Sequence, residues 1–142
     1  MADGSSKMEM GRQVLAANDA FYRAFATRDI ALMEKLWAAM LPISCAHPGW
    51  NAVRGREAVI ASWRSILSNP DSPAVVAANV TAHMLGDAAY VICEERINGA
   101  VLIATNIFAR EASDWKLTHH QAGHILGPVA QMPPPGSERN VN

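Results

Sequence analysis

The chain has 142 residues, of which 50% are hydrophobic and 18% are charged, and its formal net charge is −1. This length fits one domain with a sizeable core, and the composition is that of a globular protein. A chain so close to neutral offers no basic surface for nucleic acid, so we expect no nucleic-acid partner.

The sequence also lacks membrane and secretory signals. No apolar run approaches the length that spans a bilayer, and no apolar signal core follows a charged start. We therefore expect no membrane partner and a cytoplasmic location.

Cys45 and Cys93 lie far apart in apolar segments, which favours two buried free thiols, with a disulfide as the open alternative. Without CxxC spacing, the two cysteines predict no zinc site.

The first half of the chain predicts a disordered leader, two helices, a short strand and a third helix. The leader is small and polar, and the helices have apolar residues at helical spacing. Asp29 is a candidate N-cap for the second helix, and Pro42 ends it. These segments are residues 1–7, 8–27, 30–40, 43–47 and 56–67.

The second half predicts an antiparallel sheet followed by a flexible tail. Gly86-Asp87 and Asn98-Gly99 are signals for two-residue hairpin turns, and a polar connection runs from Glu111 to Asp114. The expected strands cover residues 74–85, 88–97, 100–110 and 115–125. We expect a single domain over residues 8–126 and a flexible Pro-rich tail over residues 127–142.

The turns predict which strand residues share a face. Two-residue loops place Val91 opposite Asn106, and this inner face is mostly small and apolar, so it could line a cavity against the helices. Glu95 is on the same face, but it is close to the Asn98-Gly99 turn, and we expect it to reach solvent. In the last strand, apolar alternation predicts that His119 is inside, opposite Asn106, and that His120 is outside. The mixed outer face is a candidate dimer surface.

Several local motifs resemble one known superfamily. They are Phe21-Tyr-Arg-Ala-Phe-Ala-Thr-Arg-Asp29, the run from His47-Pro-Gly through Gly55-Arg-Glu-Ala-Val to Trp63, Ala104-Thr-Asn-Ile-Phe108, and the segment from Trp115 to Gly123. In this order, they are similar to the SnoaL-like subgroup of the nuclear transport factor 2-like superfamily. The resemblance implies an α+β, cone-like fold in which three N-terminal helices pack on a strongly bent antiparallel sheet. It also implies a pocket at the cone mouth and a homodimer formed through the sheet.

Two enzyme groups of that superfamily suggest roles for individual residues. Compared with the steroid Δ-isomerases, His47 is at the position of the catalytic base and Asn106 is at the position of a hydrogen-bond donor. Phe21 replaces the donor tyrosine of those enzymes, which puts steroid isomerisation in doubt, and Tyr22 is its neighbour. The dehydratases use a pair of histidines, which His47 and His119 loosely resemble.

These observations favour a small-molecule-binding protein with a mostly apolar pocket. It could be an isomerase or lyase that uses His47 as general base, with Asn106 and His119 polarising an oxygen of a small hydrophobic substrate. The alternative is a non-catalytic ligand-binding or dimerisation module of the same fold. The expected ligand-binding residues are Phe21, Tyr22, Trp50, Trp63, Phe108 and Gln121.

Each assignment has a structural alternative. His47 could simply bond backbone beside a turn, Asn106 and His119 could satisfy each other, and the tryptophans could belong to the core. We expect no cofactor. We also expect no metal, because adjacent histidines such as His119 and His120 point to opposite faces of a strand.

Overall fold

The structure is a computed structural model, and it describes residues 4–126. Within this part of the chain, three helices pack on one six-stranded sheet, so the α+β prediction is confirmed. The helices are α1 (Gly4–Thr27), α2 (Ile30–Leu36) and α3 (Arg56–Ser68). The strands are β1 (Ser44–Ala46), β2 (Val53–Arg54), β3 (Val76–Leu85), β4 (Ala88–Ile97), β5 (Ala100–Glu111) and β6 (Asp114–His124).

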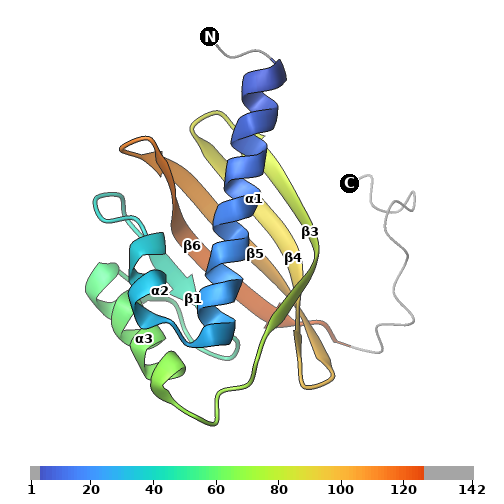
Figure 1. The fold of residues 1–142 in the computed structure, drawn as a ribbon. Coiled ribbons are helices and arrows are strands. Elements are labelled where there is room, and N and C mark those ends of the chain that lie inside the picture. The colour runs from blue at the N-terminus through green and yellow to red at the C-terminus, as the bar shows by residue number, and fades with distance from the viewer. Residues whose placement is uncertain (1–3, 127–142) are drawn as a thin grey trace.

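The sheet has the order β2-β1-β6-β5-β4-β3 and is mixed rather than purely antiparallel. The strands from β3 to β6 form the expected antiparallel meander, but β1 pairs parallel with β6. Figure 1 shows the sheet curving behind α1, with α2 and α3 beside β1. The short strand before His47 is thereby fixed to the last strand of the chain.

The helices begin and end at positions that differ in part from the expectation. Helix α1 starts at Gly4, so residues 4–7 of the expected leader are helical, while residues 1–3 and the expected tail lie outside the described residues. Asp29 caps α2 as predicted, because its side chain accepts from the backbone N–H of Leu32. The second helix ends at Leu36 rather than Met40, because Trp37 is extended and bridges Leu117 of β6.

Two β-bulges change the predicted faces of the sheet. The turns are as expected, because Leu85 pairs with Ala88 and Ile97 pairs with Ala100. In β3, however, the register shifts between Ala78 and Thr81, so that Ala77 lies opposite Glu95. An unbroken ladder from the Gly86-Asp87 turn would put Val76 and Ala78 on the inner face, but the bulge turns them outward, and Val76 is exposed.

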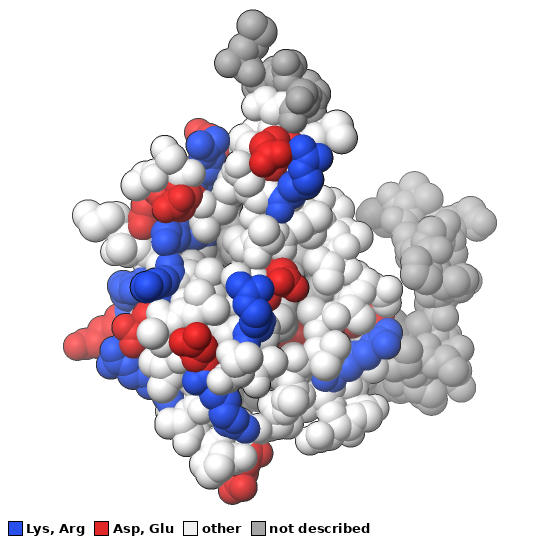
Figure 2. Space-filling model, viewed as in Figure 1, with Lys and Arg blue, Asp and Glu red and all other residues white. Residues whose placement is uncertain are grey.

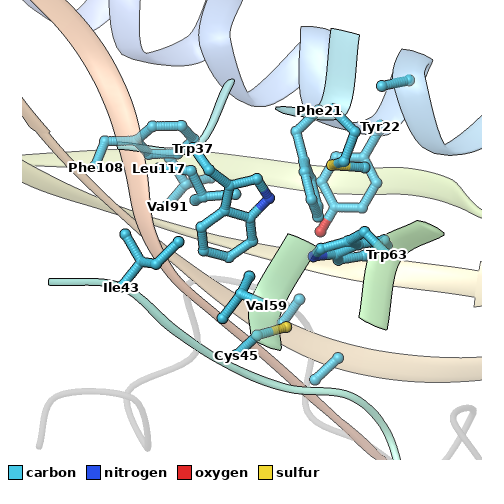
Figure 3. Close-up of a cluster of buried hydrophobic side chains, with 14 of the residues drawn as sticks. Phe21, Tyr22, Trp37, Ile43, Cys45, Val59, Trp63, Val91, Phe108 and Leu117 are labelled. Carbon is cyan, nitrogen blue, oxygen red and sulfur yellow. The ribbon is translucent and has the colours of Figure 1, made fainter. Parts of the chain in front are cut away.

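The core lies between the sheet and the three helices. Figure 3 shows Phe21, Tyr22 and Trp63 close together, with Trp37 beside Phe108 and Leu117. Burying such large aromatic groups stabilises a fold of this size by roughly 2–3 kcal/mol per side chain. Cys45 and Cys93 are free thiols within this core.

The face that α1 crosses has no large patch of one charge. Figure 2 shows Lys and Arg interspersed with Asp and Glu on this face. Helix α1 carries two ion pairs, Arg12 with Glu9 and Arg23 with Asp19. No helix in residues 4–126 is long and apolar enough to cross a membrane.

Candidate functional site

A cavity of about 460 Å³ opens between the loop after β1, the loop before β3 and the ends of β4, β5 and β6. This volume is within the usual range for small-molecule sites. Its lining is mostly apolar and contains no Lys or Arg. The lining residues are Phe25, His47, Pro48, Trp50, Ile66, Ser72, Pro73, Val75, Glu95, Ile97, Asn98, Ala100, Leu102, His120 and His124.

Arg28 fixes one wall of this cavity. Its guanidinium donates to the carbonyl oxygens of Leu67, Asn69, Pro70 and Ser72, which belong to the end of α3 and the following loop. A guanidinium has five N–H donors in a rigid plane and can bind several carbonyl oxygens at once, which the three donors of a lysine ammonium could not reproduce. The loop that contributes Ser72 and Pro73 to the lining is therefore tied to the end of α1.

His47 lines the cavity and is almost fully buried. The parallel pairing of β1 with β6 fixes the preceding strand, and alternation puts Cys45 and His47 on the same inward face. The His47 ring lies edge-on to Trp50 and Trp63, with ring centroids 4.7 Å and 4.8 Å away. Trp50 is 49% exposed at the cavity rim, whereas Trp63 is buried below the cavity.

The hydrogen bonds of Ser62 assign the tautomer of His47. The Ser62 hydroxyl donates to the carbonyl oxygen of Val59 at 2.7 Å, so it must accept from His47 Nε2 at 2.9 Å. Nδ1 is then the unprotonated nitrogen. Among the described residues, its one neighbour within hydrogen-bond range is the sulfur of Cys45, at 3.8 Å. Burial lowers the pKa of His47 to about 4, so its imidazole is neutral at physiological pH.

His120, not His119, is the second histidine of the cavity. The turn at Ala112-Ser113 pairs Glu111 with Asp114, and an unbroken ladder would place His119 opposite Asn106. Thr118 is an extra residue in β6, however, and its hydroxyl donates to the carbonyl oxygen of Ile107.

The bulge reverses the faces beyond it, so the prediction for this part of the last strand is wrong. His120 is buried and lies opposite Asn106. His119 is on the outer face, where it bonds Ser44 and Gln121. Gln121 is exposed on the same side and does not line the cavity.

Glu95 is buried in the cavity wall and does not reach solvent as expected. It is only 2% exposed, and its Oε2 accepts from the Tyr22 hydroxyl at 2.7 Å. His120 Nε2 is 3.7 Å from the same oxygen. Burial raises the pKa of Glu95 and lowers that of His120 to about 3.

Asn106 lies beneath the cavity and does not line it. Its Nδ2 donates to Asn18 Oδ1 at 2.8 Å and to the Tyr22 hydroxyl at 3.1 Å, and its Oδ1 faces His120 Nδ1. Because the amide nitrogen has two acceptors, Oδ1 must accept from His120, which leaves His120 Nε2 unprotonated. Asn106 therefore orients His120 and Tyr22, and its expected partner His119 is replaced by His120 and Asn18.

The nine predicted site residues are thus divided between the cavity and its surroundings. His47 and Trp50 line the cavity, and Tyr22 and Asn106 support it from below. Phe21, Trp63 and Phe108 are core residues, while His119 and Gln121 face outward.

Sequence reasoning missed His120, Glu95 and Asn18 as members of the site. Strand alternation had placed Glu95 on the inner face, and this signal could have identified it. Among residues 4–126, no cluster of three His, Cys, Asp or Glu side chains could hold a metal ion.

Comparison with known proteins identifies the family of this chain. The SnoaL-like domain family model matches residues 14–126, so the chain belongs to the SnoaL-like family. This confirms the resemblance to the nuclear transport factor 2-like superfamily that the motifs indicate. Among curated proteins, none matches the chain.

Several solved structures are similar to this chain. One is a protein provisionally named a dehydratase of the nuclear transport factor 2-like family from Streptomyces avermitilis. It is 31% identical, with a TM-score of 0.79, and the match covers 85% of this chain and 99% of that one. Another, from Thiobacillus denitrificans, is provisionally named a calcium/calmodulin-dependent protein kinase type II association domain, with 31% identity, a TM-score of 0.70, and coverage of 78% and 93%.

A third structure, a protein of unknown function from Pseudomonas putida, supports the fold alone. It is 17% identical with a TM-score of 0.75, and the match covers 88% of this chain and 93% of that one.

Proposed function

We propose that this protein binds a small hydrophobic molecule in the cavity and acts on it as an isomerase or lyase, with His47 as general base. One observation supports this proposal above the others. A neutral imidazole, held by Ser62 and left with one unprotonated nitrogen, lines a mostly apolar cavity. Such a group can take a proton from carbon without first losing its own.

The shared first step of both reactions is removal of a proton next to a carbonyl group. His47 Nδ1 takes the proton, and the electron pair of the C–H bond moves toward the carbonyl oxygen. An isomerase then returns the proton to another carbon, whereas a lyase expels a leaving group from the neighbouring carbon. Nε2 keeps its bond to Ser62 throughout, so the ring holds its orientation.

The similarity to the Streptomyces avermitilis protein supports the lyase form of the proposal. That protein is provisionally named a dehydratase and matches 85% of this chain. Dehydration is a lyase reaction that needs an acid and a base, and the cavity offers Glu95 as well as the imidazoles of His47, His120 and His124.

The second candidate is a non-catalytic ligand-binding module with the same cavity. The strongly lowered pKa of His47 favours it, because a base of pKa about 4 has little driving force for taking a proton from carbon. Trp50 lies beside the ring at the cavity rim and would equally serve as a wall for an apolar ligand.

Exchange of carbon-bound protons in D₂O separates the two candidates without knowledge of the substrate. With 1-indanone as probe, we expect the protein to accelerate exchange of the protons beside the carbonyl, measured by proton NMR. His47→Gln should lose about a hundredfold or more of this acceleration, the usual contribution of a general base. His83→Gln, an exposed histidine of β3, is the matched control and should retain it. Binding of 1-indanone without acceleration would favour the non-catalytic module.

We further propose that the outer face of the sheet forms a homodimer. Four large apolar side chains are exposed there, Val76 by 62% and Leu85 by 63% at the two ends of β3, and Ile103 by 45% and Ile107 by 36% on β5. Their partners on this face are Arg96, Ala88, Glu94 and Tyr90, which gives a patch of mixed apolar and polar character. A two-fold axis through such a patch would bury the apolar groups of both copies.

A further inference from the structure

We propose that Glu95 stands as a protonated carboxylic acid in the cavity wall and donates its proton to an oxygen of the ligand. It follows that the cavity selects uncharged, oxygen-bearing ligands and rejects anions. The donor role rests on the proposed function, whereas the ligand preference and the protonation of Glu95 do not.

The hydrogen bonds around Glu95 leave one of its oxygens free for a ligand. The Tyr22 hydroxyl accepts from Cys93 Sγ at 3.3 Å and from Asn106 Nδ2, so its own proton is committed to Glu95 Oε2. Oε1 makes no hydrogen bond with another residue of the described range 4–126. Because Glu95 lines the cavity, a proton on Oε1 would be available to a bound molecule.

No positive charge near Glu95 favours its ionised form. The titratable groups nearest to it are Tyr22 from α1, Cys45 from β1, Cys93 from its own strand and His120 from β6, and His47 and His124 line the same cavity. Tyr22, the two cysteines, His47 and His120 carry no positive charge at neutral pH. Arg96 follows Glu95 in the chain but is on the opposite face, where it pairs with Glu94.

The pair formed by Glu95 and His120 is neutral rather than ionic. Both side chains are almost fully buried. An ion pair here would remove two charges from water, at a cost of roughly several kcal/mol for each ion. At 3.7 Å the two groups are too far apart for the short charge-assisted hydrogen bond that would offset this cost. Burial therefore raises the pKa of Glu95 and lowers that of His120.

The resulting chemistry balances with the base already assigned. His47 takes a proton from carbon, and Glu95 gives its proton to the carbonyl oxygen to form an enol, or to a leaving hydroxyl to form water. Glu95 becomes a carboxylate that the Tyr22 hydroxyl stabilises, and His47 becomes an imidazolium. In an isomerisation, His47 returns its proton to another carbon and Glu95 recovers its proton from the enol. In a dehydration, one proton passes from His47 to Glu95 through water, which restores the starting state.

The same arrangement determines which ligands can bind. A neutral ketone or alcohol can accept from Glu95 while its carbon skeleton contacts the apolar wall. A carboxylate ligand would have no Lys or Arg to pair with and would lose its hydration, which is costly. The proposed substrate class is therefore a small, uncharged carbonyl or hydroxyl compound.

Infrared difference spectroscopy tests the protonation state directly. The spectrum of the wild-type protein minus that of Glu95→Gln at pH 7 should contain the carbonyl stretch of a carboxylic acid, which shifts in D₂O. Tyr22→Phe is the second variant should Glu95→Gln not fold, and loss of its hydroxyl should move the same band while leaving it an acid band. Carboxylate bands in place of the acid band would overturn the proposal.

Binding of two matched probes tests the selectivity without any turnover. We expect 1-indanone to bind at pH 7 at least tenfold more tightly than indane-1-carboxylate, measured by isothermal titration calorimetry. Equal binding, or binding of neither probe, would overturn the selectivity. An acid band together with no proton exchange by His47 would leave the protonation of Glu95 and the ligand preference standing, and it would reject the proposed reaction together with the donor role.

Discussion

His47 Nε2 lies 2.9 Å from the hydroxyl oxygen of Ser62, and this contact joins the loop after β1 to the middle of α3. The same hydroxyl donates to Val59 one turn earlier, so its proton is already committed. Ser62 therefore determines both the orientation and the tautomer of the histidine, in the way that a second residue commonly orients a catalytic imidazole.

Replacing Ser62 with alanine should reduce the proton-exchange activity strongly and the stability only slightly. Ser62→Ala leaves the ring in place between two tryptophans but removes the group that accepts from Nε2. We expect proton exchange of 1-indanone to fall about tenfold or more, while the free energy of unfolding falls by about 1 kcal/mol, a typical net value for one hydrogen bond. Ser68→Ala is the matched control, because Ser68 bonds a backbone carbonyl on the same helix but is exposed. Equal loss of activity in both variants would contradict the role of Ser62.

The lowered pKa of His47 predicts a pH dependence of stability. Its pKa is about 4 in the folded protein against an ordinary 6.5, so between these values the unfolded chain takes up a proton that the folded one does not. The free energy of unfolding should therefore fall as pH drops from 7 and stop falling, for this group, below pH 4. The shift corresponds to at most about 3.5 kcal/mol at roughly 1.4 kcal/mol per pKa unit.

Urea unfolding of the wild type and of His47→Gln across this pH range measures that contribution. The variant should lose less stability between pH 7 and pH 4, because its residue 47 does not titrate. His120 changes the free energy of unfolding with pH in the same direction as His47, and Glu95 changes it in the opposite direction because its pKa is raised. Both residues are present in the wild type and in the variant, so the difference between the two proteins reports His47. Parallel stability curves for the two proteins would show that His47 titrates normally.

The hairpin turns and the face of the central strands could be predicted from the sequence. Asn98-Gly99 pairs Val91 with Asn106 as expected, because a two-residue turn with positive φ at both positions fixes the register of its strands. Strand alternation from that turn places Glu95 on the inner face. Its depth could not be predicted, because it depends on tertiary packing that brings Tyr22 of α1 and His120 of β6 against it.

The choice between His119 and His120 could not be made from the sequence. It depends on one bulge at Thr118, and Thr118 fits a regular strand as well as a bulged one. The bulge that contains Asn79 gives a local signal, because Asn tolerates positive φ, but Asn is also common in regular turns. A single extra residue reverses every later side chain, so site residues beyond a bulge are the least predictable part of the fold.

Asn106 should be important for stability although it does not line the cavity. It is fully buried and bonds Asn18, Tyr22 and His120. Asn106→Leu keeps the volume but leaves buried polar groups unpaired, and each costs about 1–3 kcal/mol. We expect a loss of roughly 3 kcal/mol or more in the free energy of unfolding, measured by urea denaturation. Asn51→Leu, in an exposed loop, is the control and should change stability by less than about 0.5 kcal/mol. A similar small effect at Asn106 would mean that its hydrogen bonds contribute little.

The outer face of the sheet predicts the oligomeric state. We expect a dimer of the 15.3 kDa chain by size-exclusion chromatography with light scattering. Ile103→Glu places a carboxylate directly opposite Glu94 in the middle of the exposed apolar patch, so it should weaken the dimer by like-charge repulsion and by loss of apolar burial. Leu85→Glu is the matched control, because Leu85 is apolar and more exposed than Ile103 but lies at the end of this face, at the β3–β4 turn. A wild-type protein at the monomer mass would exclude the dimer, and dissociation by Leu85→Glu alone would move the interface to the hairpin end of the sheet.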